Sequence, residues 1–194
     1  MREAVSRGFS VTAFGRRKEN NTQAQTHICR DIFDLTREDL AGFDAVVDAF
    51  GVWNEADFGL YSTTLAHLCD ILSGTKVRLL VVGGAGSLYV NPEHTKTLSQ
   101  EADFPEAFKP LANAAAKSLG ELRKRDDVIW TYVSPAADFQ AEGERTGSYL
   151  LGGEELRCND RGESVISYAD YAIAMVDEIE RGEHLQERIG VVRA

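Results

Sequence analysis

The sequence predicts an α/β fold in which helices cover both faces of one doubly wound parallel sheet. Strand-like apolar runs alternate with amphipathic helical patterns along the chain. The run over 77–82 is almost continuously apolar, which is typical of a strand buried on both faces of a parallel sheet. Because 194 residues can bury a sizeable core without disulfides, we expect one domain over 1–194.

The first half of the chain is predicted to hold three strands. These strands are expected at residues 9–14, 27–30 and 44–50. Residues 1–7 have the composition of the end of a helix, and Gly8 suits the position after its last residue. Thr36, with Asp39 three residues later, forms a capping-box pattern. Apolar spacing over 57–72 predicts a longer helix.

The second half continues the alternation. Strands are expected at residues 77–82, 128–133 and 189–192. A helix over 105–125 is predicted to turn five apolar residues inward, which are Phe108, Leu111, Ala115, Leu119 and Leu122. Ser167 and Asp170 cap a helix that runs through Ile179. The segment from 138 to 162 is rich in Gly and Glu, and we expect a functional or capping loop there.

Composition excludes several classes of protein. The formal charge of −10 argues against nucleic-acid binding, which needs a dense cationic surface. No run of about 18 apolar residues exists, so we expect no membrane span. The three widely spaced cysteines, Cys29, Cys69 and Cys158, suit reduced thiols better than a disulfide framework or a zinc site, and we expect a cytoplasmic protein.

Two arginines follow the first predicted strand. In a doubly wound sheet, ligands bind beyond the carboxyl ends of the strands. Arg16 and Arg17 stand at such an end, where guanidinium groups can bind a ribose 2′-phosphate. This placement favours NADP(H) over NAD(H), and the alternative is a solvated cluster of loop charges.

A glycine-rich stretch, Gly83 to Ser87, follows the most apolar strand. Its spacing does not match a strand-to-helix phosphate loop, because Tyr89 takes the third glycine position and Pro92 follows soon after. These glycines would instead let the backbone approach a ligand and present Ser87, or they simply form a turn.

Further polar residues follow along the chain. Lys117 lies on a predicted helix among alanines, which would let a flat cofactor approach, although a lone helical lysine is more often solvated. Ser134 and Pro135 end the next strand, and the proline fixes a turn at the mouth of the sheet.

A resemblance to a known family spans essentially the whole chain. The motifs that carry it are Phe-Gly-Arg-Arg from Phe14, Arg-Asp-Ile-Phe-Asp-Leu-Thr from Arg30, Val-Val-Asp-Ala-Phe-Gly from Val46, Leu-Leu-Val-Val-Gly-Gly-Ala-Gly-Ser-Leu from Leu79, Ser-Pro-Ala-Ala-Asp-Phe from Ser134 and Gly-Glu-Arg-Thr-Gly-Ser-Tyr from Gly143. The chain resembles the atypical short-chain dehydrogenase/reductase group that binds NAD(P)H and includes NADH-flavin reductases. The resemblance implies a Rossmann-like fold.

The resemblance also implies site residues. Those expected to bind the cofactor are Arg16, Arg17, Asp31, Ile32, Phe50, Gly51, Gly83, Lys117, Ser134 and Pro135. Lys117 matches the lysine that holds the nicotinamide ribose in related reductases, and with Ser87 it forms the expected catalytic set. Arg145 and Tyr149 are expected to line the acceptor side, unless that stretch is an ordered surface loop with local salt bridges.

Two departures from the group bear on chemistry. Asn113 stands four residues before Lys117, where the group has a tyrosine, so the usual phenolic proton donor is absent. Dehydrogenation of an ordinary alcohol is therefore disfavoured, whereas hydride transfer to FMN, FAD or a similar conjugated acceptor needs less help from a protein acid. Ser87 could orient or protonate that acceptor.

The second departure is at the front of the chain. Relatives in this group begin with a central strand and a Gly-x-x-Gly-x-x-Gly turn that binds pyrophosphate, and this sequence lacks both. We therefore expect a natural polypeptide longer by a strand, a glycine turn and most of a helix. We also expect the sequence as it stands to bind dinucleotide weakly.

Three functional interpretations follow. The first is an NAD(P)H-dependent reductase of a flavin or similar small conjugated acceptor. The second is a non-catalytic module that senses NAD(P)H, which the missing tyrosine also permits, and the third is an inactive truncated product. The sequence leaves open the physiological acceptor and whether the chain forms a homodimer.

Overall fold

The computed structural model describes residues 1–194 and confirms the α/β class. Its α-helices are α1 (Arg2–Ser6), α2 (Arg37–Leu40), α3 (Leu60–Leu72), α4 (Lys109–Leu122) and α5 (Tyr168–Arg181). Its strands are β1 (Thr12–Gly15), β2 (Thr26–Cys29), β3 (Ala45–Asp48), β4 (Arg78–Val82), β5 (Ile129–Ser134), β6 (Asp138–Gln140), β7 (Tyr149–Gly152), β8 (Val165–Ser167) and β9 (Glu187–Arg193). Four short 3₁₀ helices, at 32–34, 55–57, 98–100 and 106–108, complete the regular structure.

The strands form three hydrogen-bonded groups. The main sheet has the order β3-β4-β5-β9-β7, and its first four strands are parallel. β7 joins its far edge antiparallel to β9. β1 and β2 form a separate parallel pair, as do β6 and β8. Parallel pairing dominates, as predicted.

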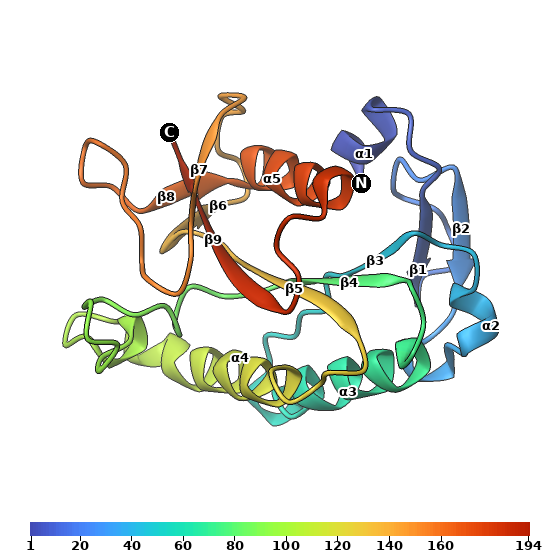
Figure 1. Cartoon of the computed structure of the whole chain (residues 1–194), viewed down its shortest axis with the longest axis horizontal. Coiled ribbons are helices and arrows are strands. Elements are labelled where there is room, and N and C mark those ends of the chain that lie inside the picture. The colour runs from blue at the N-terminus through green and yellow to red at the C-terminus, as the bar shows by residue number, and fades with distance from the viewer.

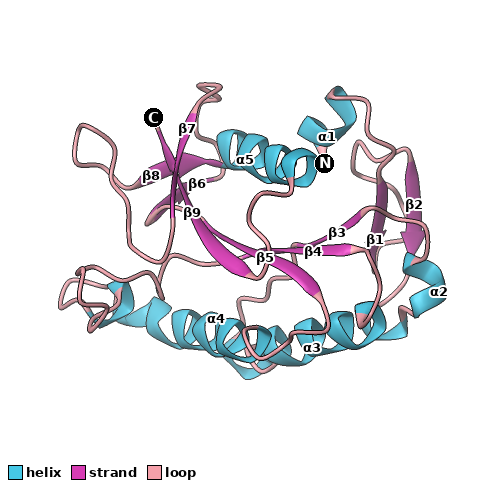
Figure 2. Ribbon diagram, in the orientation of Figure 1, coloured by secondary structure: helices cyan, strands magenta, loops and turns pink.

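Helices cover both faces of the main sheet, as a doubly wound fold requires. Figure 1 shows α3 and α4 side by side beneath the strands and α5 with α1 above them. Figure 2 shows the same three layers, with strands between two layers of helix. α3 contacts α4, and α1 contacts α5.

Successive side chains of β4 point to opposite faces of the sheet and belong to two separate core clusters. Leu79 and Val81 point toward the cluster that includes the inner faces of α3 and α4, whereas Leu80 points toward the cluster under α5. All three side chains are at most 5% exposed. Burial on both faces explains why this strand is the most apolar run of the sequence.

β1 and β3 belong to separate sheets. β1 pairs only with β2, and β3 pairs only with β4, so no hydrogen-bonded ladder joins the two groups. In the 3-2-1-4-5-6 strand order of a doubly wound fold, a further strand would lie between two such groups. Val47 of β3, 42% exposed, is among the large apolar side chains left accessible.

Local start and stop signals were predicted well. Gly8 follows α1 with a φ of +86°. Thr36 and Asp39 form the predicted capping box at α2. Ser167 accepts from the Asp170 N–H at the start of α5. No helix is long and apolar enough to cross a membrane.

Two expectations about elements were wrong. The segment expected as a loop, 138–162, contains β6 and β7, because these strands are three and four residues long and gain stability from pairing with distant segments. Phe108, expected to point inward, is 51% exposed because it precedes α4 in a 3₁₀ turn whose direction differs from the helical face.

Candidate functional site

Several of the predicted site residues follow strands of the main sheet at one edge of that sheet. β3, β4 and β5 are parallel, so the residues that follow their last positions emerge at the same edge. Phe50 and Gly51 follow β3, Gly83 follows β4, and Ser134 with Pro135 closes β5. Arg16 and Arg17 follow β1, and Asp31 and Ile32 follow β2, at the ends of the separate parallel pair.

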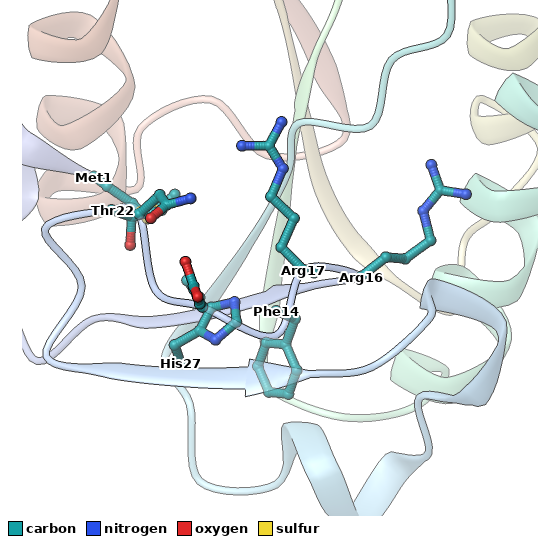
Figure 3. Close-up of a pocket in the computed structure, with 10 residues that line it drawn as sticks. Met1, Phe14, Arg16, Arg17, Thr22 and His27 are labelled. Atoms are coloured by element: carbon teal, nitrogen blue, oxygen red, sulfur yellow. The ribbon is translucent and has the colours of Figure 1, made fainter.

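The end of β1 opens into a cavity of about 680 Å³. Its lining consists of Met1, Ala13, Phe14, Gly15, Arg16, Arg17, Glu19, Asn21, Thr22 and His27. Figure 3 shows that Arg16 and Arg17 leave the strand end in different directions, with the Phe14 and His27 side chains below them. Both arginine side chains are exposed, and neither forms a salt bridge.

These arginines fit the adenosine end of a dinucleotide. An unpaired guanidinium can form two parallel hydrogen bonds with a phosphate, and Arg16 and Arg17 have no protein carboxylate to displace first. The open cavity gives an anionic ligand access to them. The charge and exposure of these two side chains are therefore compatible with a phosphate group of the kind NADP(H) carries.

Asp31 and Ile32 have structural partners at the end of β2. The Asp31 carboxylate accepts from the Phe33 N–H at 3.0 Å and so caps the short helix that follows. Ile32 packs against the core cluster under α3. These contacts hold both residues in place next to the loop that carries Arg16.

The loop after β3 is held by a buried carboxylate and a tyrosine. Asp48, 8% exposed, accepts from the Phe50 N–H at 2.9 Å. Burial raises the pKa of Asp48, and the Phe50 hydrogen bond only partly opposes this. Tyr61 Oη bonds the backbone of Val52, and its ring packs edge-on to Phe50. Phe50 and Gly51 are therefore fixed at the site edge.

The glycines after β4 permit close packing. A Cβ on Gly83 would lie 2.2 Å from the Tyr132 ring, and one on Gly86 would lie 2.6 Å from Ala112 Cβ. Gly84 has room, since its nearest neighbour would be Ala115 Cβ at 3.9 Å. The glycines therefore have a packing role, as the alternative of a plain turn expects, and the stretch also carries the half-buried Ser87.

The last residue of β5 is buried and not accessible from the edge of the sheet. Ser134 is fully buried, and its Oγ has no hydrogen-bond partner. The adjacent Tyr132 ring lies against Gly83, and burial raises the pKa of Tyr132 to about 12. Pro135 lies in the short connection between β5 and β6.

Lys117 does not point inward. Its side chain is 71% exposed, and its nearest carboxylate is Glu121 on the same helix, at 3.9 Å. Asn113, one turn earlier, is exposed on the same side of α4. The helix instead turns Ala112 and Ala115 toward the Gly83–Ser87 stretch, because these small residues let the backbones approach.

Arg145 and Tyr149 lie in an ionic network with α1 and α5. Arg145 binds the Glu3 carboxylate at 3.1 Å. The Tyr149 hydroxyl donates to Asp177 Oδ2 at 2.6 Å. Burial and the Asp177 carboxylate raise the pKa of Tyr149 to about 12. The salt bridge of Arg145 thus reaches α1, 142 positions away in the sequence, instead of a partner within its own loop, and neither Arg145 nor Tyr149 is hydrogen-bonded to Ser87.

Two residues that the sequence did not single out, Arg188 and Glu154, form one hydrogen-bonded group with Ser87. Arg188 of β9 donates from Nη1 to Ser87 Oγ at 2.8 Å, and its Nη2 binds Glu154. Arg188 stands next to the apolar run 189–192, but a charged neighbour of a strand is common. No local sequence pattern indicates that the Arg188 side chain is buried and reaches Ser87.

The chain is similar to a known protein family and to a curated bacterial protein. Residues 1–181 match the NAD(P)H-binding family. The chain is 43% identical over 194 residues to "Uncharacterized protein YwnB" of Bacillus subtilis (strain 168), an alignment that covers 99% of this chain and 91% of that protein.

Solved structures of similar sequence have the same fold. A Streptococcus pneumoniae TIGR4 protein described as a "putative NADH-flavin reductase" is 50% identical with a TM-score of 0.96, covering 100% of this chain and 91% of that one. A Bacteroides thetaiotaomicron protein described as a "putative epimerase" is 35% identical with a TM-score of 0.83, covering 99% and 89%. The resemblance inferred from the motifs is confirmed, and the chain belongs to the NAD(P)H-binding family.

Proposed function

We propose that the protein is an NAD(P)H-dependent reductase of a flavin or a similar small conjugated acceptor. The observation that carries this proposal is the 50% identity, over the whole chain, to the Streptococcus pneumoniae protein described as a "putative NADH-flavin reductase". Two features support it: loops that follow neighbouring parallel strands emerge at one edge of the main sheet, and a cavity at the end of β1 is lined by two arginines that form no salt bridge.

Different residues would bind the cofactor and the acceptor. Arg16 and Arg17 would bind the phosphate of NADP(H), and the Phe50–Gly51 turn and Gly83 would bound the space beside it. The dinucleotide supplies the hydride when it is bound. Ser87 would donate a hydrogen bond to the acceptor, and Lys117, whose side chain is largely exposed beside Glu121, would have to turn to reach the nicotinamide ribose.

Turnover tests the proposal. The protein is mixed with NADPH or NADH and with FMN or riboflavin, and oxidation of the nicotinamide is followed by its absorbance. We expect consumption that depends on both components and is faster with NADPH. Absence of consumption with every pair would refute the reductase.

A second function has specific support. The phenolic acid of the family pair is replaced by Asn113, and Lys117 is turned to solvent, so the chain could bind NAD(P)H without turning it over. Titration with NADPH, followed by quenching of protein fluorescence, separates the two. Saturable binding without turnover would favour a sensing module.

A further inference from the structure

The hydroxyl of Ser87 accepts a hydrogen bond from a buried arginine on a strand that is not adjacent to β4. The Arg188 side chain, only 1% exposed, extends from β9 and donates from Nη1 to Ser87 Oγ at 2.8 Å. β5 lies between β9 and β4, the strand that precedes Ser87. The contact therefore joins residues that are 101 positions apart.

This contact fixes the direction of the Ser87 hydroxyl. A guanidinium has only N–H donors, so in the bond with Arg188 the serine oxygen must accept. The hydroxyl hydrogen then needs a different acceptor, and Ser87 donates to no protein group. Since Ser87 is half-buried at the site edge, its free hydrogen is available to a ligand there.

The charges around Arg188 strengthen this donor. Arg188 binds the Glu154 carboxylate, and Glu154 is also bound by Arg123 through two contacts of 2.6 Å. Two guanidinium groups share one carboxylate, so the cluster carries a formal charge of +1. A cation that donates to a hydroxyl oxygen polarises its O–H bond and makes it a better donor.

The arrangement is costly for a purely structural contact. Burial lowers the pKa of Arg188, which shows that desolvation disfavours its charge. Its Nε–H is buried without any partner. An apolar side chain of similar size would avoid both penalties. A role at the site gives a reason for the charge at this position.

We propose that Arg188 is a positioning residue that locks Ser87 as a hydrogen-bond donor to the small-molecule acceptor. The acceptor would present a lone pair to Ser87, as the carbonyl oxygens and ring nitrogens of a flavin do. This inference rests on the proposed reductase function and names the contact by which that acceptor is held.

A mutant cycle with a matched control tests the inference. The variants are Ser87→Ala, Arg188→Met, the double variant and Arg123→Gln, which loosens the same carboxylate without touching Ser87. The first readout is the dissociation constant of FMN without NADPH, from quenching of flavin fluorescence. The second is the KM and kcat for FMN with NADPH.

We expect Ser87→Ala and Arg188→Met each to weaken FMN binding about three- to tenfold, the usual effect of one lost hydrogen bond. KM should rise by a similar factor. The double variant should be no weaker than Ser87→Ala, because Arg188 acts only through that hydroxyl. Arg123→Gln should bind FMN as the unmodified protein does, and Ser87→Thr, which keeps a hydroxyl, should restore binding.

Other results would overturn the inference. If the protein reduces FMN and Ser87→Ala binds FMN normally, the inference fails while the reductase stands. Equal losses in Arg123→Gln and Arg188→Met, or additive losses in the double variant, would show a general charge effect instead. If the unmodified protein neither binds nor reduces FMN, the proposed function fails and takes the inference with it. Should Arg188→Met not melt cooperatively, Arg188→Lys, which keeps the positive charge but has a single donor nitrogen, replaces it in the cycle.

Discussion

The backbone N–H of Gly147 donates a hydrogen bond of 2.9 Å to the buried carboxylate of Asp170. Thr146 adds two more bonds to the same carboxylate, from its N–H at 3.1 Å and its hydroxyl at 2.8 Å. Asp170 lies in the first turn of α5, where a negative charge also suits the helix dipole. The glycine-rich loop that carries Arg145 is thus anchored to α5.

Asp170→Asn should lower the free energy of unfolding by roughly 1–3 kcal/mol, because an amide places N–H groups against N–H donors. Denaturant unfolding at pH 7 measures the loss. Asp160→Asn is the matched control, since Asp160 is exposed and forms no side-chain hydrogen bond, and it should leave stability unchanged.

The same residue predicts a pH dependence. Burial raises the pKa of Asp170, but bonds from Gly147, Thr146 and Ser167 outweigh burial and lower it overall. A lowered pKa in the folded state contributes stability that is complete above the unfolded pKa and is lost as pH falls through the folded value. The stability difference between the protein and Asp170→Asn should therefore shrink in acid. A difference that grows on acidification would contradict this.

Gly83→Ala should destabilise the protein by roughly 1–3 kcal/mol, since the added methyl would meet the buried Tyr132 ring at 2.2 Å. Gly84→Ala, one residue on, has 3.9 Å of room and should fold normally. Thermal unfolding of the pair measures the effect. Equal melting temperatures would show that the Tyr132 ring can move away.

Arg16→Ala and Arg17→Ala test cofactor preference. Each should raise the dissociation constant of NADPH about tenfold or more and barely change that of NADH, because only NADPH carries the 2′-phosphate. Lys18→Ala is the control, since Lys18 is on the same loop but does not line the cavity. Equal effects on both cofactors would mean that the arginines bind another part of the dinucleotide.

Thiol labelling should separate the three cysteines. Cys69 is 1% exposed, and burial raises the pKa of its thiol to about 11, whereas Cys29 and Cys158 are exposed. A thiol reagent at pH 7.5 should therefore titrate about two thiols in the native protein and all three in denaturant. Rapid labelling of all three in the native state would show that the α3 region opens readily.

The predicted and observed elements agree best where a pattern is local. The capping box at Thr36, the glycine after α1 and the cap at Ser167 depend on neighbouring residues, and each was confirmed. β7 was missed because its four residues are stabilised by pairing with β9, about 40 positions later. Lys117 was expected inward because alanines surround it, but the turn of the helix gives those alanines the inner face.

The sequence by itself determined the α/β class, the parallel strands and the family, because these depend on apolar periodicity and on motifs that can be read in order. It also located the unpaired arginines after β1. Only the tertiary structure showed the hydrogen bonds of Arg188 with Ser87, of Gly147 with Asp170, and of Tyr149 with Asp177. Each of these contacts joins residues more than 20 positions apart. Such contacts form only when the fold brings distant segments together, and no local pattern encodes them.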